Sequence, residues 1–133
     1  MAEQENVQTV KEAYAAFERG DIPSLLNLVS EDVEWSLPGP SDIIPFAGEF
    51  RGREGVGRFF AALGGAEDVE IFEPQEFVAQ GDKVVALGQY RWRVKQSGRE
   101  YGGDWAHVFT VRDGKIAGFH EYMDTAAAAD AYK

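Results

Sequence analysis

The apolar positions near the start of the chain follow first a helical spacing and then an extended one. Over residues 4–19, apolar side chains recur at helical intervals, which predicts an amphipathic helix that ends at Gly20. A second, short helix is expected from Pro23 to about Val29, because proline is favoured in the first turn of a helix. From Val33 to Leu37, apolar and polar residues alternate, which is typical of a half-buried strand.

Residues 38–52 contain the prolines of a loop but also large apolar side chains. Three of the five prolines of the chain lie in this segment and stiffen it. Its large apolar residues are Ile43, Ile44, Phe46 and Phe50. Such a loop is expected to fold over the interior as a lid. A third helix is predicted from Glu54 to Leu63, although Gly55 and Gly57 weaken its helical propensity.

The second half of the chain has the alternation of long β-strands. Strands are predicted over 68–79, 83–95, 100–112 and 115–124. The turns between them are marked by Gly81-Asp82, Ser97-Gly98 and Asp113-Gly114. A last short helix over 126–132 is expected, with Thr125 as its cap. Three helices followed by antiparallel strands predict one α+β domain over residues 1–133, in which the helices pack on one face of a curved sheet and enclose a hollow.

Composition and charge exclude several kinds of partner. The chain carries 13 basic and 23 acidic residues, a net charge of −10, so we do not expect it to bind nucleic acid. No apolar run approaches the roughly 18 residues that span a membrane, and the acidic start lacks the features of a secretory signal. The absence of cysteine excludes disulfides and cysteine-based zinc sites. We therefore expect a cytoplasmic protein that does not interact with membranes.

His107 and Glu121 are of most chemical interest, because they are titratable and lie in segments that otherwise resemble a core. Whether they meet depends on the turn at Asp113-Gly114. A two-residue turn pairs His107 with His120 and sends Glu121 to the other face of the sheet. A three-residue turn pairs His107 with Phe119 and makes His107 and Glu121 diagonal neighbours on one face. We favour the second register, because it gathers large apolar side chains on that face.

The preceding turn is consistent with these faces. A two-residue turn at Ser97-Gly98 puts Gly88 opposite His107, which leaves space beside the imidazole. The same register points Arg91 and Arg93 outward, where a charge costs little free energy.

Two interpretations of the histidine and the glutamate follow. An imidazole exchanges protons near neutral pH, and an apolar cavity disfavours a charged carboxylate, so the pair can act as general acid and base. Alternatively, His107 is a satisfied core histidine and Glu121 lies at a solvated rim. We expect no metal site, because the other histidine, His120, lies in the opposite strand phase. No phosphate-binding motif is found either, and we expect no cofactor.

Several segments resemble one known family. They are Tyr14–Asp21, Pro45–Gly52, Val108–Ile116 and Glu121–Thr125. These segments are similar to the SnoaL-like branch of the NTF2-like superfamily, which includes ketosteroid isomerases, polyketide cyclases and limonene epoxide hydrolases. The resemblance covers nearly the whole chain. It implies a cone-shaped α+β barrel with an apolar pocket, usually dimeric through the outer sheet face, but the fold hosts many chemistries.

The resemblance also implies roles for single residues. In polyketide cyclases of this branch, a carboxylate matching Glu121 is the acid/base group and a histidine matches His107. In the isomerases, the position matching His107 carries an acid that stabilises an oxyanion. Glu121 is therefore the expected acid or base, with His107 as its partner and as stabiliser of developing negative charge. Tyr14 is the expected hydrogen-bond donor.

Other positions depart from the enzymes of the superfamily. The general base of the isomerases matches Leu37, and their catalytic tyrosine aligns with Ala13, next to Tyr14. The epoxide hydrolases use an arginine–aspartate pair, which is missing around Arg91-Trp92-Arg93. These departures argue against steroid isomerisation and against epoxide hydrolysis.

Large side chains on the predicted inner faces are expected to line a pocket for a small, apolar, cyclic molecule. They are Tyr14, Trp35, Leu37, Phe46, Tyr90, Trp92, Trp105, Phe119 and Met123. The outer face, with Val108, Ile116, His120 and Tyr122, favours a homodimer. The predicted function is binding of that molecule with cofactor-independent acid/base catalysis, such as isomerisation or cyclisation. The alternatives are a non-catalytic ligand-binding or dimerisation module and a protein-interaction module.

Overall fold

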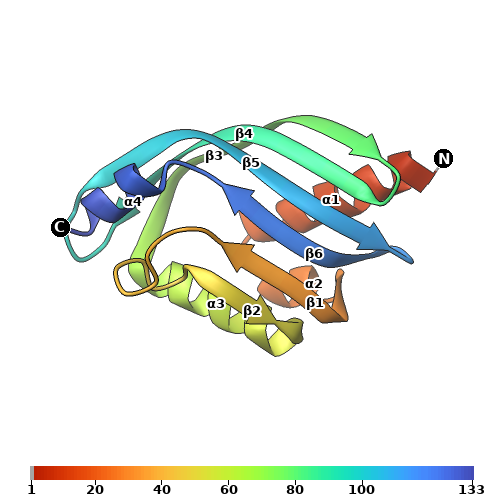
Figure 1. Cartoon of the computed structure of the whole chain (residues 1–133), viewed down its shortest axis with the longest axis horizontal. Helices are drawn as coiled ribbons and strands as arrows, with labels where there is room; N and C mark the ends of the chain where they lie inside the picture. The colour runs from red at the N-terminus through yellow and green to blue at the C-terminus, as the bar shows by residue number, and fades with distance from the viewer. Residues whose placement is uncertain (1) are drawn as a thin grey trace.

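The computed structural model describes residues 2–133, which form four helices and six strands (Figure 1). In chain order they are α1 (Ala2–Glu18), α2 (Ile22–Leu26), β1 (Val29–Leu37), β2 (Gly48–Arg51), α3 (Gly52–Ala66), β3 (Glu67–Gln80), β4 (Lys83–Val94), β5 (Glu100–Arg112), β6 (Lys115–Tyr122) and α4 (Thr125–Ala131). None of these helices is both long enough and apolar enough to cross a membrane.

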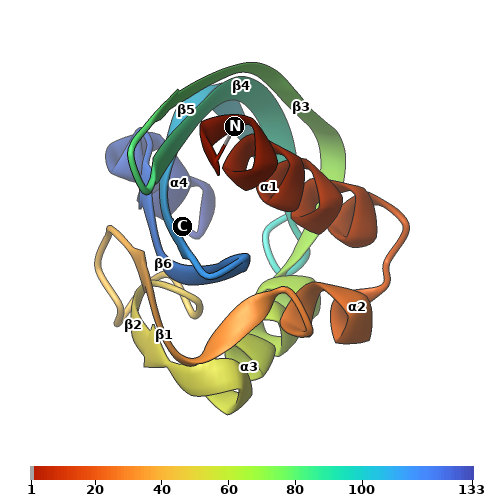
Figure 2. The same ribbon diagram turned by 90° about the vertical axis from the view of Figure 1, so that its right-hand side faces the viewer.

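All six strands belong to one curved sheet in the order β2-β1-β6-β5-β4-β3. Only β1 and β6 run parallel, and the sheet does not close, so β2 and β3 are its edges. Viewed end-on, the strands arch over α1, and α2 and α3 lie on the opposite side of the interior (Figure 2). The predicted α+β fold, with helices on one face of a curved and mainly antiparallel sheet, is confirmed.

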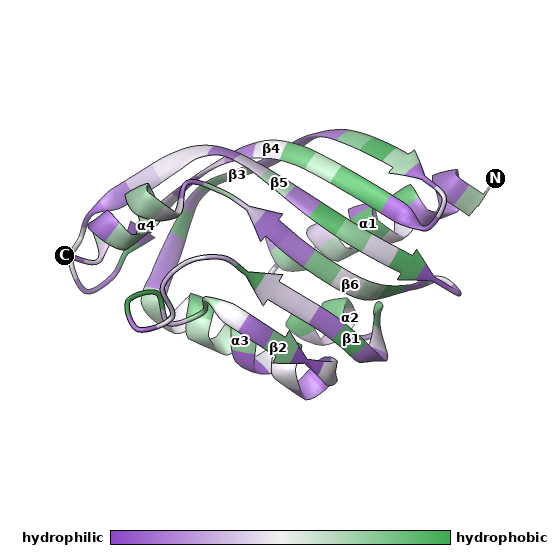
Figure 3. Cartoon of the chain, viewed as in Figure 1, coloured by the Kyte–Doolittle hydropathy of each residue, from purple (hydrophilic) through white to green (hydrophobic). Residues whose placement is uncertain are grey.

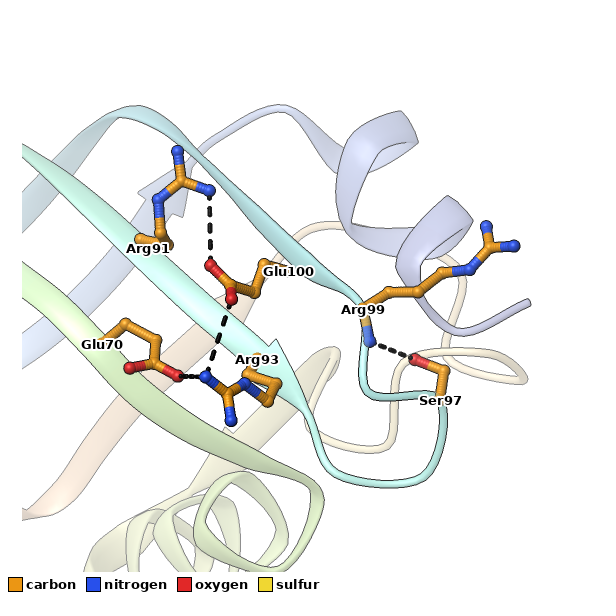
Figure 4. Close-up of polar contacts among 6 residues, drawn as sticks. All are labelled: Glu70, Arg91, Arg93, Ser97, Arg99 and Glu100. Atoms are coloured by element: carbon orange, nitrogen blue, oxygen red, sulfur yellow. Dashed lines mark hydrogen bonds and ion pairs between the residues drawn. The ribbon is translucent and has the colours of Figure 1, made fainter.

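The faces of the strands follow from the alternation of side chains in an extended chain. On β4, Val84, Ala86, Tyr90 and Trp92 are buried in the core. Arg91 and Arg93, on either side of Trp92, point outward, as predicted. Figure 4 shows the ion pairs that these two arginines form on the outer face with Glu100 and Glu70. Because all four groups are well exposed, these ion pairs contribute little to stability.

The predicted loop over 38–52 contains one regular element. Its end forms the edge strand β2, which pairs with β1. Before that strand, Ile44 and Phe46 are buried in the core, whereas Ile43 is exposed. The segment therefore covers the interior, as a lid would. The cap of α4 also differs from expectation: the carboxylate of Asp124, not Thr125, accepts the N–H of Ala127 at 3.0 Å.

The expected pairing of β5 with β6 was wrong in detail. Asp113 and Gly114 both have positive φ, 52° and 75°, which is typical of a two-residue type I′ turn. An extra residue in β6 at Ala117 then shifts the ladder, so that His107 lies directly opposite Glu121. The two-residue turn pairs Ile116 with the buried Val111, so Ile116 is fully buried in the core and does not belong to the outer face.

The expected pairing of β4 with β5 was wrong by two residues. Gly88 lies opposite Trp105, and Ala86 lies opposite His107. Residues 95–98 form the loop, closed by a hydrogen bond of 2.8 Å from the N–H of Val94 to the carbonyl of Arg99. A shift by two residues preserves the side-chain faces, which is why the predicted faces are correct although the predicted neighbours are not.

Gly88 provides the space for the indole of Trp105. A Cβ atom at this position would lie 2.4 Å from Trp105 Cζ2 and 2.2 Å from the carbonyl oxygen of Glu73. Both distances are well inside van der Waals contact, and one of the two atoms belongs to the backbone.

The substitution Gly88→Ala is therefore expected to lower the free energy of unfolding by about 1–3 kcal/mol, the typical cost of overpacking a core. Gly64→Ala is the matched control, because Gly64 lies in α3 with open space around it. Alanine in a helix is expected to leave stability unchanged or raise it by up to about 1 kcal/mol. Urea denaturation of both variants measures the difference. Equal stabilities would contradict the close packing of Trp105 on Gly88.

Candidate functional site

Three side chains from different elements form one hydrogen-bonded chain in the interior. The hydroxyl of Tyr14 on α1 lies 2.8 Å from Nδ1 of His107 on β5. Nε2 of the same imidazole lies 3.1 Å from Oε2 of Glu121 on β6. All three residues are at most 8% exposed. His107 and Glu121 therefore share the inner face of the sheet, and Glu121 does not lie at a solvated rim.

Aromatic rings hold the imidazole in place. Trp105 stacks on His107 with ring centroids 4.0 Å apart, and Phe119 meets it edge-on at 4.8 Å. On the other side, Tyr14 lies among Phe72, Phe77, Trp105 and Phe109 as well as His107. The rings exclude water, so the hydrogen bonds of the chain operate in a low-dielectric environment.

Burial decides which group carries which proton. It raises the pKa of the Tyr14 hydroxyl far above its ordinary value, and the negative charge of Glu121 raises it further. Tyr14 therefore keeps its proton and donates it to Nδ1 of His107. A neutral imidazole then carries its hydrogen on Nε2 and donates it to the carboxylate of Glu121. In this arrangement both nitrogens of His107 are occupied.

The chain of hydrogen bonds borders an internal cavity of about 80 Å³. Its walls come from the three N-terminal helices and from β1, β3, β4, β5 and β6. The lining residues are Ala13, Tyr14, Phe17, Leu25, Trp35, Phe59, Phe60, Leu63, Phe72, Trp92, His107, Phe109, Phe119 and Glu121. This volume is about half of the roughly 150 Å³ that holds benzene in an apolar cavity, so a ring enters only when the wall moves outward.

One part of the wall separates the cavity from a groove on the surface. The groove has a volume of about 590 Å³ and lies between the end of α1, α3 and the start of β3. Both hollows are lined by Phe17, Phe60, Leu63, Phe72 and Trp92, which we call the aromatic wall. Three of these residues, Phe17, Phe60 and Phe72, are only half-buried. They are the side chains best placed to move aside.

The structure divides the predicted pocket residues into two sets. Those that line the cavity, besides His107 and Glu121, are Tyr14, Trp35, Trp92 and Phe119. Those that do not line it are Leu37, Phe46, Tyr90, Trp105 and Met123. The first four of the second set are buried in the core, and Met123 packs against the core. No group of three or more potential metal ligands lies together within residues 2–133.

The interior holds a second buried carboxylate that was not expected from the sequence. Glu67, the first residue of β3, is only 3% exposed. Its Oε1 accepts the hydroxyl of Tyr101 at 2.7 Å, and its Oε2 accepts the hydroxyl of Tyr132 at the end of α4. A glutamate at the boundary between a helix and a strand gives no sequence signal of burial, because both of its partners are distant along the chain.

With this geometry described, the comparison with known proteins identifies the family. The sequence matches the SnoaL-like domain over residues 10–119. The chain belongs to the SnoaL-like family. An NTF2-like protein from Burkholderia xenovorans LB400 has the same fold, with a TM-score of 0.91 and 40% identity over 100% of this chain and 99% of its own.

Two further relatives match this SnoaL-like protein at lower sequence identity. TerC, which was co-crystallised with polyporic acid, is 29% identical with a TM-score of 0.83, over 96% of this chain and 98% of its own. The uncharacterized protein Rv0034 of Mycobacterium tuberculosis is 27% identical over 99% of this chain and 98% of its own. The membership that the resemblance implied is confirmed.

The buried carboxyl of Glu67 makes the stability of this SnoaL-like protein depend on pH. Burial raises the pKa of Glu67 above its ordinary value, although hydrogen bonds from Tyr132 and Tyr101 oppose the change. Between the ordinary and the raised pKa, the folded chain holds this proton and the unfolded chain does not. Stability therefore falls as the pH rises through that interval.

We expect wild type to lose stability relative to Glu67→Gln as the pH rises from about 4.5, the ordinary pKa of the group. Urea denaturation of both proteins at a series of pH values measures the difference, which isolates the one carboxyl that glutamine lacks. A difference that stays constant with pH would show that burial does not perturb the ionisation of Glu67.

Proposed function

We propose that this SnoaL-like protein binds a small, largely apolar cyclic molecule in its cavity and transfers a proton on it without a cofactor. The observation that carries the proposal is the hydrogen-bonded chain of Tyr14, His107 and Glu121, buried at the wall of an otherwise apolar cavity. A buried titratable pair at the wall of a cavity is a usual arrangement for general acid/base catalysis.

Glu121 is the proposed base. Its carboxylate takes a proton from a carbon next to a carbonyl group, and the electron pair of that C–H bond moves into an enolate. The protonated carboxyl then returns a proton to the same carbon or to another one, which completes an exchange, an isomerisation or one step of a cyclisation. His107 orients the carboxylate through Nε2–H, and Tyr14 fixes the tautomer of His107.

The relatives support the binding of a small organic molecule. TerC shares the fold over nearly the whole chain and was co-crystallised with polyporic acid. The alternative is a non-catalytic ligand-binding or dimerisation module with the same cavity. The two functions differ in turnover, not in the presence of a pocket.

The test is hydrogen–deuterium exchange of cyclopentanone in heavy water, followed by NMR. Wild type is expected to accelerate exchange of the hydrogens next to the carbonyl over the buffer rate. Glu121→Gln is expected to reduce this acceleration by about 10²- to 10⁴-fold, the range for loss of a general base. Glu73→Gln, which removes an exposed carboxylate on β3, is the matched control and is expected to behave as wild type.

A second readout uses the imidazole signals, which are simple to assign because the chain has two histidines. Glu121→Gln is expected to change the chemical shifts of the His107 ring, whose Nε2 contacts the carboxylate, and not those of His120. Binding of cyclopentanone without any acceleration of exchange would contradict the catalytic proposal and support the binding module.

We also propose that two copies associate through the outer face of the sheet, which α1, α2 and α3 leave uncovered (Figure 1). Figure 3 shows the run of apolar residues on β4 that contributes to this face. Paired positions across neighbouring strands form two rows that we call the outer patch. Its residues are Ser36, Val78, Val85, Leu87, Ala106, Val108, His120 and Tyr122. Exposed apolar surface of this kind favours association.

Val108 lies at the centre of the outer patch, between Val85 and His120. Wild type is expected to sediment with twice the chain mass of 14.7 kDa, and Val108→Asp with the mass of a monomer, because a charge at the centre is costly to bury. Ile71→Asp, at an exposed aliphatic residue of β3 outside the patch, is the control and is expected to remain a dimer. A monomeric wild type at micromolar concentration would contradict the proposal.

A further inference from the structure

Trp35 carries a buried hydrogen-bond donor with no acceptor. The residue is 5% exposed, and its Nε1 has no hydrogen-bond partner among residues 2–133. The indole stacks on Phe119 with centroids 4.1 Å apart, and it also contacts Phe59 and Phe60. These three neighbours are hydrocarbon rings. A buried donor left unpaired costs about 1–3 kcal/mol, so this N–H is a site that an acceptor can occupy with a gain in free energy.

The catalytic proposal requires such a donor, and the hydrogen-bonded chain of Tyr14, His107 and Glu121 cannot supply it. Proton removal next to a carbonyl puts negative charge on the carbonyl oxygen, which needs a hydrogen-bond donor. The hydroxyl of Tyr14 is engaged by Nδ1 of His107, and the Nε2–H of His107 is engaged by Glu121. Glu121 itself is an acceptor. Among the side chains that line the cavity, Trp35 has an N–H that is buried and uncommitted.

The strand geometry sets the distance between the two ends of the site. Trp35 pairs with Phe119 across β1 and β6, and Glu121 follows Phe119 by two residues on the same face. Two residues along a strand span about 7 Å. Both Trp35 and His107 also contact the ring of Phe119. Trp35 and Glu121 are therefore close neighbours on the inner face of the sheet, and both line the cavity.

Charge further restricts the ligand. The cavity walls contain no lysine or arginine, and Glu121 contributes a carboxylate. The groove behind the aromatic wall carries Glu18, Asp68 and Glu70. The carboxylates of the groove would repel an anionic ligand, and no cation in the cavity walls would compensate its charge. A neutral carbonyl compound avoids both unfavourable effects.

We propose that Trp35 donates its indole N–H to the carbonyl oxygen of a neutral, single-ring ketone or enone and stabilises the enolate that Glu121 generates. This inference rests on the proposed function and adds to it the substrate class and the donor for the oxyanion. The role of His107 is then to orient Glu121, and the stabilisation of negative charge expected of it from the sequence passes to Trp35.

The test compares cyclopentanone with methylenecyclopentane, which has the same shape but CH₂ in place of the oxygen. In wild type and Trp35→Phe, the dissociation constants of both probes are measured by NMR titration. The substitution is expected to weaken cyclopentanone binding by about 5- to 30-fold, and methylenecyclopentane binding much less, because only the ketone loses a hydrogen bond. Exchange of cyclopentanone in heavy water is expected to slow by about 10²- to 10³-fold.

Tyr90→Phe is the control. It removes the hydroxyl of a buried core residue that does not line the cavity, so the ratio of the two dissociation constants is expected to stay that of wild type. The indole proton of Trp35, assigned among three tryptophans, provides a readout in the unmutated protein. It is expected to move downfield with cyclopentanone and not with methylenecyclopentane.

The outcomes separate the two proposals. If both probes bind to wild type and Trp35→Phe weakens them equally, or if the Trp35 indole proton does not respond to the ketone, Trp35 is not the donor and the acid/base proposal stands. If neither probe binds to wild type, the cavity does not accept a ring, and both proposals are overturned.

Discussion

The contact between His107 and Glu121 depends on one extra residue in β6. Without the bulge at Ala117, the two-residue turn at Asp113-Gly114 would place His107 opposite His120 and turn Glu121 toward the outer face. Because side chains alternate along a strand, a single inserted residue changes the face of every residue beyond it. Ile116, which precedes the bulge, and Glu121, which follows it, therefore both face the interior. The candidate site and the core beneath it thus depend on one local irregularity.

Within the site, burial determines which group donates and which accepts in each hydrogen bond. A phenol that cannot ionise has one proton to give, and its acceptor must be Nδ1 of His107. That bond leaves the imidazole one proton, which the carboxylate of Glu121 accepts. The order of donors runs from α1 to the sheet and ends at the carboxylate of Glu121, which accepts the hydrogen bond from His107. A histidine placed in this way works through its neighbour rather than on a ligand directly.

The sequence predicted which face of the sheet a side chain occupies better than it predicted which residue lies opposite it on the next strand. The inward direction of His107, Glu121 and Trp35 followed from alternation, and alternation is insensitive to a shift of two residues. The exact partners of these residues depend on the loop at 95–98 and on the bulge at Ala117, and neither has a distinct sequence signature.

The cavity was predicted only in part, because the curvature of the sheet decides which inward residues reach it. Trp35 and Trp92 border the cavity, whereas Tyr90 and Trp105 point the same way and are covered by other side chains. Phe17, Phe60 and Phe72 were not expected to line it, since their contacts join segments that are far apart in the chain. Glu67 was missed for the same reason.

The aromatic wall has a kinetic consequence. Its half-buried rings come from α1, α3 and β3, so no single loop can open the cavity by swinging away. A molecule that passes through this wall has to displace at least one of these rings. Entry and exit are then limited by side-chain motions of the wall, and they are expected to be slower for wide molecules than for narrow ones.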